Sequence, residues 1–235
     1  MARTNVLLIG SGAREHAIAW KLRQSPDLGE LYVAPGNPGT AEVAENLPVE
    51  AADIPGLIAC AKERRVGLTV VGPEDPLAEG IVDHFADFGL AAFGPTQEAA
   101  RIESSKRAAN DLTRRAGVPT GSSMVFRQYN AAREYLADHA YPLVVKADGL
   151  ARGKGVSVCR TRQEAEDAIA AALVDKVFGE AGTTVLIEEF LTGREVSALA
   201  LCDGERFVLL PMAQDHKPAL DGDRGPMTGG MGTLT

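Results

Sequence analysis

The sequence has no apolar run long enough to cross a membrane, few cysteines and no excess of basic side chains. Its first apolar run, Val6 to Ile9, is also too short for the core of a signal peptide, so the cytoplasm is the expected location. Acidic side chains outnumber basic ones by 32 to 24, and the formal net charge is −8. This balance argues against a protein that binds nucleic acid by general electrostatic attraction, although a small anionic substrate needs only a locally positive site.

The three cysteines are far apart in the sequence and lack the spacing of metal ligands. We interpret them as small apolar residues buried in a protein of a reducing compartment. They are Cys60, Cys159 and Cys202. The chain has 235 residues, of which 45% are hydrophobic, and this is enough to bury a core in one large domain or two smaller ones.

Short apolar runs alternate with helical stretches through the first hundred residues. The expected strands are residues 5–9, 31–34, 68–71 and 91–93, and the expected helices are residues 14–24, 53–65 and 76–88. Asp53 is the expected N-cap of the second helix, with Pro55 in its first turn. This alternation indicates an α/β fold with a Rossmann-like parallel sheet covered on both faces. Ligands of such sheets bind beyond the carboxyl ends of the strands. The loops expected at that edge begin at Gly10, Pro35, Gly72 and Gly94.

The pattern changes after Thr96, where a long helical segment runs to Arg115 with a possible new cap at Ser104 or Ser105. A compact α+β unit follows. Its expected strands are residues 123–126, 143–145, 156–159, 185–187, 195–202 and 206–211. One helix is expected to begin at an Asn130 cap and end near residue 139, and a second to begin at a capping box of Thr161 and Glu164. The last twenty residues are expected to form loops.

The turn Gly10-Ser11-Gly12 matches the first two glycines of the dinucleotide-binding fingerprint. The third small position is Glu15, and the second strand ends in Ala34 without the acidic residue that binds a ribose hydroxyl, so nicotinamide binding is disfavoured. The backbone amides of this turn still predict a phosphate cradle, assisted by Arg14 and His16. The alternative is a tight strand-to-helix turn without a ligand.

Two carboxylates, Glu74 and Asp75, follow the strand that ends before Gly72. At the ligand edge of the sheet such groups accept hydrogen bonds from sugar hydroxyls. Helix capping by Asp75 is an equally good interpretation from spacing alone.

Lys146 ends a buried strand, where its charge is costly unless an anion pairs with it. A glycine-rich loop follows, and together they predict a site for the phosphates of a nucleotide. The loop residues concerned are Gly149, Gly153, Lys154 and Gly155. The spacing is not that of a P-loop, because three residues separate Gly149 from Gly153 and a glycine follows Lys154. The alternative is a hairpin loop with solvated charges.

The remaining candidates are weaker when each is taken singly. Taken alone, Lys106 is more often a solvated surface lysine, and the acids of Glu188-Glu189-Phe190-Leu191 and Glu195 are more often surface or capping groups. A polar tract near the carboxyl end is dense enough to bind two small polar ligands, and a disordered terminal loop is its alternative. The tract contains Asp215, His216 and Lys217, then Asp221, Asp223 and Arg224, and then Thr228, Gly229, Gly230, Met231 and Gly232.

Eight stretches in order resemble the ATP-grasp superfamily and, within it, the family of phosphoribosylamine–glycine ligases (glycinamide ribonucleotide synthetases). Each stretch is weak singly, but their order through nearly the whole chain is specific. They are residues 6–17, 34–40, 71–74, 93–96, 146–156, 187–191, 214–217 and 228–232.

The resemblance implies a domain order as well as a fold. It implies a Rossmann-like N-terminal domain (residues 1–103), a linker helix (104–122), the ATP-grasp lid subdomain (123–191) and the start of the second ATP-grasp subdomain (192–235), so that the ATP-grasp α+β domain is incomplete.

The resemblance also implies glycine, 5-phosphoribosylamine and ATP with Mg²⁺ (or Mn²⁺) as substrates and cofactor, and a glycyl phosphate as the intermediate. It implies neither a nucleic-acid nor a membrane partner, and it sets no oligomeric state. By matching position, ATP would contact Lys106, Lys146, Gly149, Gly153, Lys154, Gly155, Glu188, Glu189, Phe190, Leu191 and Glu195. Phosphoribosylamine and the reacting groups would contact Gly10, Ser11, Gly12, Arg14, Glu74, Thr228, Gly229 and Gly230, with Asp215, His216 and Lys217 in catalytic positions.

Two positions depart from the family pattern, since Met227 stands where asparagine is typical and Pro218 where arginine is usual. The sequence also ends at Thr235, before the acidic and asparagine ligands that the family uses for magnesium. We therefore expect this polypeptide by itself to be inactive or nearly so. The alternatives are an ATP-grasp ligase for another carboxylate or amine, a non-catalytic nucleotide-binding fragment, and the disfavoured nucleotide-dependent oxidoreductase.

Overall fold

The computed structural model describes residues 3–151, 155–222, 224–228 and 230–235, except for the side chains at positions 226 and 227. The chain forms two compact units, unit 1 (residues 1–119) and unit 2 (residues 120–235), and each is described by itself. The boundary between them falls inside the segment 104–122, which the sequence predicts to be a linker helix.

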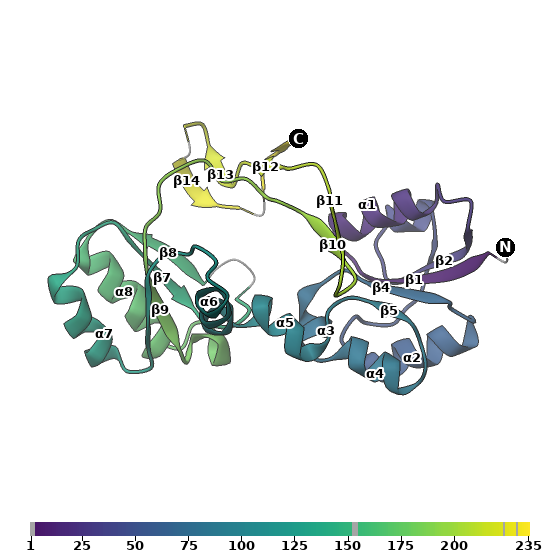
Figure 1. Ribbon diagram of the computed structural model, residues 1–235, viewed down its shortest axis with the longest axis horizontal. Helices are drawn as coiled ribbons and strands as arrows, with labels where there is room; N and C mark the ends of the chain where they lie inside the picture. Colours follow the sequence, from purple (N-terminus) through teal and green to yellow (C-terminus); the bar gives the residue numbers. More distant parts are fainter. Residues whose placement is uncertain (1–2, 152–154, 223, 229) are drawn as a thin grey trace. The chain divides into compact units, whose positions relative to one another are not determined.

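Unit 1 is built on a five-stranded sheet in which every neighbouring pair of strands is parallel (Figure 1). The strand order is β3-β2-β1-β4-β5. The strands are β1 (Thr4–Gly10), β2 (Leu28–Pro35), β3 (Glu45–Asn46), β4 (Leu68–Val71) and β5 (Ala92–Phe93). The predicted parallel sheet is therefore confirmed, and β4 has the bounds expected from the sequence.

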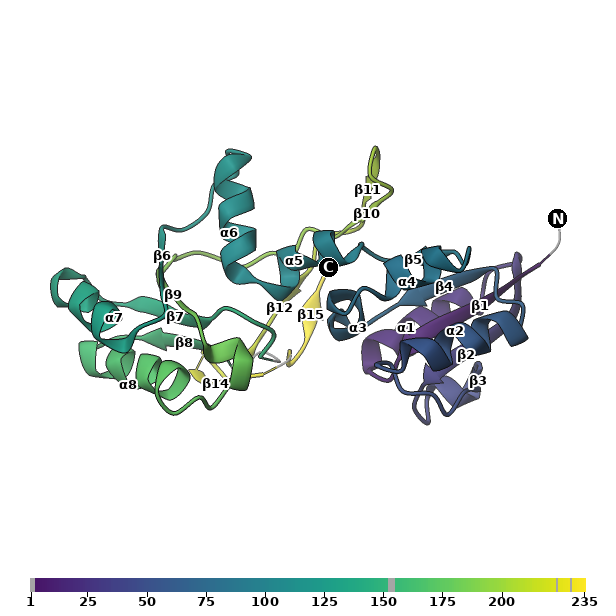
Figure 2. The ribbon, with the colours of Figure 1, turned by 90° about the horizontal axis from the view of Figure 1, so that it is seen from below.

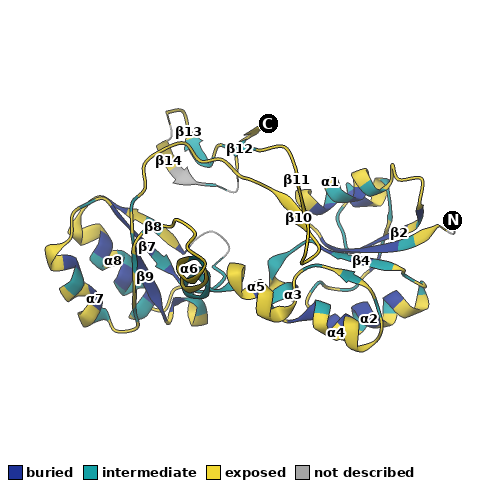
Figure 3. Ribbon diagram, in the orientation of Figure 1, coloured by how far each residue is buried: buried dark blue, intermediate teal, exposed yellow. Residues whose placement is uncertain are grey.

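Helices cover both faces of this sheet because the apolar side chains of β1 alternate between two cores (Figure 3). Leu7 and Ile9 pack on the side of α2 and α4, whereas Val6 and Leu8 pack on the side of α1. Fully burying one such side chain stabilises the fold by about 1.5–3 kcal/mol. The helices of unit 1 are α1 (Ala13–Leu22), η1 (Thr40–Glu42), α2 (Ile54–Glu63), α3 (Glu74–Ala78), α4 (Ile81–Asp87), α5 (Gln97–Ser104) and α6 (Lys106–Arg115).

Two expected helical stretches are each divided into two helices. The helix expected over 76–88 is interrupted at Gly80, whose φ of 82° is a left-handed conformation that glycine adopts readily. The stretch up to Arg115 is divided at Ser105, one of the two caps predicted there; Ser105 is extended and accepts a hydrogen bond from the Ala108 N–H at 3.1 Å. The predicted Asp53 cap is confirmed, since its Oδ1 accepts from the Gly56 N–H at 3.0 Å.

Unit 2 contains a four-stranded antiparallel sheet in the order β6-β9-β7-β8. Helices α7 and α8 lie on one face of this sheet and enclose its core with Leu143, Val145, Val185 and Ile187 (Figures 1 and 2). The elements are β6 (Ser123–Phe126), α7 (Tyr129–Tyr135), η2 (Leu136–Asp138), β7 (Leu143–Ala147), β8 (Val156–Cys159), α8 (Arg162–Leu173), η3 (Gly179–Gly182) and β9 (Val185–Glu189). The expected Asn130 cap is wrong, because α7 starts earlier and Asn130 is its second residue.

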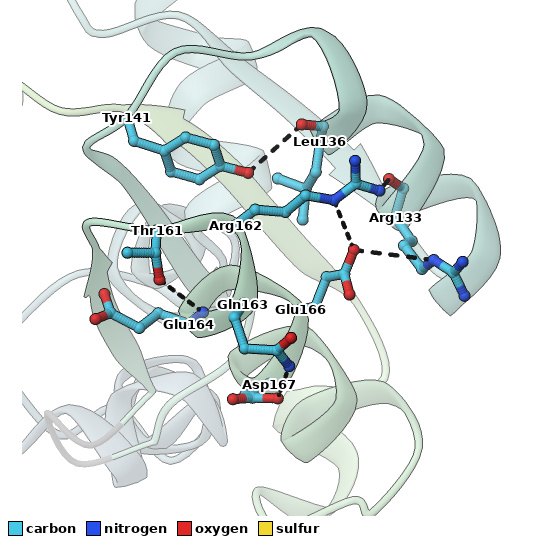
Figure 4. A network of polar contacts seen from close by, with 9 residues as sticks. All are labelled: Arg133, Leu136, Tyr141, Thr161, Arg162, Gln163, Glu164, Glu166 and Asp167. Carbon is cyan, nitrogen blue, oxygen red and sulfur yellow. Dashed lines mark hydrogen bonds and ion pairs between the residues drawn. The ribbon is translucent and has the colours of Figure 1, made fainter.

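The start of α8 shows how the two helices are joined (Figure 4). Thr161 accepts from the Glu164 N–H at 3.3 Å, as the predicted capping box requires, but the Glu164 carboxylate accepts from the Arg160 N–H at 2.7 Å, one residue earlier than expected. Oε1 of Glu166 accepts a hydrogen bond from Nε of Arg162 at 2.8 Å and lies 3.9 Å from Nε of Arg133 on α7. The hydrogen bond that Arg162 donates to Glu166 raises the pKa of the Arg162 guanidinium above its ordinary value.

The remainder of unit 2 consists of short strands. They are β10 (Ala200–Cys202), β11 (Phe207–Leu209), β12 (Gln214–Asp215), β13 (Pro218–Leu220), β14 (Arg224–Met227) and β15 (Thr233–Leu234). The strands expected over 195–202 and 206–211 are both shorter than predicted. The last twenty residues were expected to form loops, but their described part also contains the short strands β13, β14 and β15. Every residue of β10 and β11 is exposed (Figure 3). Within the described ranges, no helix has the length and apolarity needed to span a membrane.

Candidate functional site

The carboxyl edge of the unit 1 sheet brings three of the predicted loops together. Strand β1 pairs with β2 on one side and with β4 on the other, so the strand order reverses at β1. Ligands of such sheets bind at this switch point, beyond the carboxyl ends of the strands. Gly10 ends β1 with φ of 128°, and Gly12 is the N-cap of α1. The Gly36 N–H donates to the Gly10 carbonyl at 3.1 Å, and the Gly72 N–H donates to the Ile9 carbonyl at 3.0 Å. These bonds fix the loops after β2 and β4 against the turn.

Glu15 fills the space between the ends of β1 and β4. Its side chain is buried, and a Cβ atom at Gly10 would lie 2.6 Å from its Cγ. A Cβ atom at Gly72 would overlap its carboxylate. Oε2 accepts from the Gly12 N–H at 2.7 Å, so one amide of the predicted phosphate cradle is already used inside the turn. In the sequence, Glu15 served only as evidence against nicotinamide binding. Its role in filling the space between β1 and β4 was not predicted.

Arg14 links this buried carboxylate to the next loop. Its Nε donates to Glu15 Oε1 at 2.8 Å, and its NH2 lies 3.6 Å from Glu74 Oε2. The hydrogen bond to Glu15 is the main reason that the pKa of the guanidinium is raised, so the side chain stays cationic. Two predicted substrate-binding residues thus lie together at the switch point. The helix-capping interpretation of Asp75 is wrong, because Pro73 is the N-cap of α3 and Asp75 lies within its first turn.

The loop after β2 is held to the same turn by Asn37. Its Nδ2 donates to the carbonyl oxygens of Ser11 at 2.9 Å and of Gly12 at 3.2 Å. Ser11 and Gly12 are predicted substrate-binding residues. The sequence predicts no role for Asn37, which lies within the resembling stretch 34–40. His16 packs against the same loop, since a Cβ atom at Gly39 would lie 2.5 Å from its Cε1.

Lys146 in unit 2 has an anionic partner supplied by the protein. Its Nζ lies 2.5 Å from Oε2 of Glu188 on the neighbouring strand β9, and both side chains are largely buried, at 31% and 13% exposed. The need for an anion beside a lysine in a buried strand is therefore met within the fold, which weakens that part of the argument for phosphate. The Lys146–Glu188 pair still places charged groups on the sheet face opposite α7 and α8. The exposed apolar side chains of Val156 and Val158 on β8 lie on the same face.

The base of the predicted glycine-rich loop is fixed at both ends. The Gly149 N–H donates to the Ala181 carbonyl at 3.2 Å, and a Cβ atom at Gly149 would lie 2.8 Å from Ala181 Cβ. Gly155 accepts from the Ala147 N–H at 2.8 Å. Gly149 is therefore required for close packing, and its amide is used in the fold rather than offered to a phosphate. Gly153 and Lys154 lie outside the described residues.

The run Glu188 to Leu191, predicted to contact ATP, lies at the end of β9. The strand extends two residues beyond the predicted end at Ile187 and includes both Glu188 and Glu189. The Glu189 carboxylate accepts from the N–H and the hydroxyl of Ser122, each at 3.2 Å, which ties it to the start of β6. Phe190 is half-buried and Leu191 is exposed, so an apolar surface follows the strand.

A second charged cluster joins residues for which the sequence predicted different roles. Lys217 Nζ lies 3.1 Å from Asp215 Oδ2 and 3.5 Å from Glu195 Oε2. The hydrogen bond from Lys217 lowers the pKa of Asp215, and the same bond raises the pKa of Lys217. Glu195, a predicted ATP contact, is thereby placed beside two predicted catalytic residues.

The other residues of this tract are fixed mainly through the backbone. The Thr228 hydroxyl donates to the Lys217 carbonyl at 2.7 Å and accepts from the Gly230 N–H at 3.1 Å. The His216 N–H donates to the Gly232 carbonyl at 3.0 Å. Thr228 therefore holds the predicted catalytic tract in place. Gly229 lies outside the described residues.

The two positions predicted to depart from the family pattern are backbone neighbours. Pro218 of β13 is the Cα partner of Met227 of β14.

Lys106 is the first residue of α6 and is half-buried in unit 1, whereas Lys146 belongs to unit 2. The predicted sites thus form three groups: the switch point of unit 1, the Lys146 region and the Lys217 cluster. Over residues 3–151, 155–222, 224–228 and 230–235, no group of three or more His, Cys, Asp or Glu side chains is arranged to hold a metal ion.

A Rossmann-like parallel sheet followed by an antiparallel α+β unit, with a lysine near a strand end and a glycine-rich hairpin after it, defines the ATP-grasp class. The family models agree with this assignment. Residues 4–103 match the N domain of phosphoribosylglycinamide synthetase, and residues 104–235 match its ATP-grasp (A) domain. The chain belongs to the phosphoribosylglycinamide synthetase family.

Relatives within this family cover almost all of the chain. It is 52% identical over 238 residues to the phosphoribosylamine–glycine ligase of Rhodopirellula baltica, which aligns with 99% of this chain and 54% of that protein. The crystal structure of phosphoribosylamine–glycine ligase from Thermotoga maritima superposes with a TM-score of 0.82 at 34% identity, over 97% of this chain and 55% of that one. The chain thus spans about half the length of these relatives.

A more distant structure shares the fold only. Biotin carboxylase from Campylobacter jejuni, solved as a complex with β,γ-ATP, superposes with a TM-score of 0.71 at 18% identity, over 92% of this chain and 52% of that one. The likeness is one of strand and helix arrangement only.

Proposed function

We propose that this chain forms part of an enzyme that joins the carboxylate of glycine to the amine of 5-phosphoribosylamine and consumes ATP. The observation that carries the proposal is the 52% identity to a phosphoribosylamine–glycine ligase over 99% of the chain. A glycine carboxylate oxygen attacks the γ-phosphorus of ATP, and ADP leaves. The amine nitrogen then attacks the acyl carbon of glycyl phosphate and loses a proton, and phosphate leaves with the C–O bonding pair. The products are glycinamide ribonucleotide, ADP and phosphate.

The residues of unit 2 fit the ATP part of this proposal. Phosphoryl transfer depends mainly on positioning and on neutralising phosphate charge. Lys146, held by Glu188, offers a cation with two further N–H donors beside an apolar sheet face. The predicted ATP contacts of Gly155 and of the run 188–191 belong to the same proposal, whereas Lys106 lies in unit 1 and the Gly149 amide is used inside the fold. The apolar Leu191 and half-buried Phe190 suit an adenine ring.

The residues of unit 1 fit a sugar phosphate. A helix N-terminus with oriented amides and a cationic Arg14 attracts a phosphate dianion. Glu74 lies beside Arg14 and is 43% exposed, which leaves its carboxylate able to accept from a ribose hydroxyl. We assign the Asp215, His216 and Lys217 cluster to the reacting groups, where the Lys217 ammonium would stabilise negative charge on the acyl phosphate.

Mg²⁺ belongs to the proposal only as the usual companion of ATP. The carboxylates in the described part of the chain do not group into a metal site.

The test is a coupled assay of ADP release by the protein in the length that its gene encodes. The proposal expects ADP formation to require glycine and phosphoribosylamine together, and other amino acids to replace glycine poorly. ADP formation that is independent of glycine, or that prefers another carboxylate, would refute the assignment to this reaction.

A further inference from the structure

The peptide group between Ser11 and Gly12 is held at both ends by side chains from two different elements. Asn37, in the loop after β2, donates from Nδ2 to the Ser11 carbonyl at 2.9 Å. Glu15, on α1, accepts from the Gly12 N–H at 2.7 Å. The C=O and N–H groups of a planar trans peptide point in opposite directions, so one bond at each end fixes the orientation of the plane.

The next peptide group is held at its carbonyl end only. The Gly12 carbonyl accepts from Asn37 Nδ2 at 3.2 Å and from the His16 N–H at 3.1 Å. The N–H on the other side of this plane belongs to Ala13, the first residue of α1. The first N–H groups of a helix have no intrahelical acceptor, so the Ala13 N–H points outward from the helix N-terminus. Its direction is therefore set by Asn37 together with the His16 N–H.

Asn37 is itself held in one orientation. Its Oδ1 accepts from the Thr40 N–H at 3.0 Å, which leaves Nδ2 as the group that faces the two carbonyls. Thr40 is fully buried, and its hydroxyl donates to the Asn37 carbonyl at 2.8 Å. Asn46 Nδ2 donates to the same carbonyl at 2.8 Å. A half-buried polar network thus anchors one side-chain amide that contacts the turn.

We propose that Asn37 is a positioning residue for the sugar-phosphate site. Through the two carbonyls it aims the amide of Ala13 at the phosphate group of a phosphoribosyl substrate. Glu15 meanwhile holds the Gly12 N–H inside the turn and Arg14 beside it. The inference deepens the proposed function and rests on it for the identity of the substrate.

The probe is ribose 5-phosphate, which carries the phosphorylated sugar of the proposed substrate. The 235-residue chain is titrated with it by calorimetry and by ¹H–¹⁵N correlation spectra, in which the Ala13 amide signal is followed. Asn37→Asp replaces the donor by a carboxylate that repels both carbonyls, and Asn37→Ala removes the donor without adding charge. Each is expected to weaken ribose 5-phosphate binding by roughly tenfold or more, since a hydrogen bond that orients a charged contact is lost.

Asn5 provides a matched control at the opposite end of β1. It also accepts a backbone N–H through Oδ1, from Glu30 at 3.0 Å, and donates through Nδ2 to a backbone carbonyl, that of Arg64 at 2.9 Å. Asn5→Asp is therefore the same chemical change in the same type of bond. It is expected to leave the affinity for ribose 5-phosphate and the shift of the Ala13 signal unchanged.

The outcomes separate the inference from the function. Weaker binding and a lost Ala13 shift in both Asn37 variants, but not in Asn5→Asp, support the inference. Equal affinity in wild type and Asn37→Ala overturns it while leaving the proposed function intact. A wild-type chain that binds MgATP but not ribose 5-phosphate removes the sugar-phosphate site, and the inference falls with it.

Discussion

Nζ of Lys217 lies 3.1 Å from Oδ2 of Asp215, and this bond shifts the pKa of each partner toward its charged form. The carboxyl pKa is lowered below its ordinary value of 3.8. The pair's contribution to stability is therefore present above that value and is lost as the pH falls through the lowered pKa. At neutral pH both groups are charged, which is the state that an acyl-phosphate site requires of the lysine.

Replacing Lys217 by methionine is expected to raise the pKa of Asp215 toward its ordinary value, because the largest stabilisation of its charged form is removed. The midpoint is read from the carboxyl carbon signal in an NMR titration. Asp203 is the internal control, since its pKa is lowered by the backbone N–H groups of Arg206 and Glu205 instead. A midpoint of Asp215 that stays in place in Lys217→Met would show that the pair does not form in solution.

Gly72→Ala is expected to lower the free energy of unfolding by about 1–3 kcal/mol, because the added methyl group meets the Glu15 side chain in a filled space. Urea unfolding is followed by the fluorescence of Trp20, the single tryptophan, which lies in α1 of unit 1. In a Glu15→Ala background all three atoms nearest to the new methyl group are gone. The cost of Gly72→Ala should then fall to within about 0.5 kcal/mol of zero, and a cost that persists would refute the packing described here.

The three thiols are expected to differ widely in reactivity. Cys202 is exposed on β10, Cys60 is half-buried, and burial is the main cause that raises the pKa of Cys159 to about 11. Ellman's reagent at pH 8 should modify Cys202 rapidly and leave Cys159 unmodified until the protein is denatured. The rapid phase should disappear in Cys202→Ser, and a rapid phase that remains there would contradict the burial of the other two thiols.

The sequence predicts the sheets better than the helix boundaries. Apolar runs bounded by turn residues located three strands to the residue: 68–71, 123–126 and 156–159. The interpretation of the cysteines as buried was right for Cys159 and wrong for Cys202. The helix break at Gly80 is missed, because a left-handed glycine is decided by packing rather than by local propensity. The cap at Ser105 is one of the two positions that the sequence offers.

The candidate site was predictable in its residue types but not in its contacts. The alternation of strands and helices predicts that Gly10 ends β1, that Glu74 follows β4 and that Lys146 lies near the end of β7. The buried position of Glu15 depends on β1 and β4 being neighbours, and the partnership of Lys146 with Glu188 depends on the pairing of β7 with β9. Such contacts are set by sheet order, which a single sequence does not specify.

The central claim is that Lys146 contacts the phosphates of a nucleotide bound to the ATP-grasp part of this chain. Its most direct test is the dissociation constant of MgATP, measured by calorimetry for the wild type and for Lys146→Met. Lys21→Met is the matched control, since Lys21 is an exposed lysine of α1. Glu188→Gln with Lys146→Met serves as a second variant that does not leave the carboxylate unpaired. The account predicts that both Lys146 variants bind MgATP at least about tenfold more weakly than the wild type and the control, as expected for loss of a charged hydrogen bond to phosphate. Equal affinity in all four proteins would contradict it.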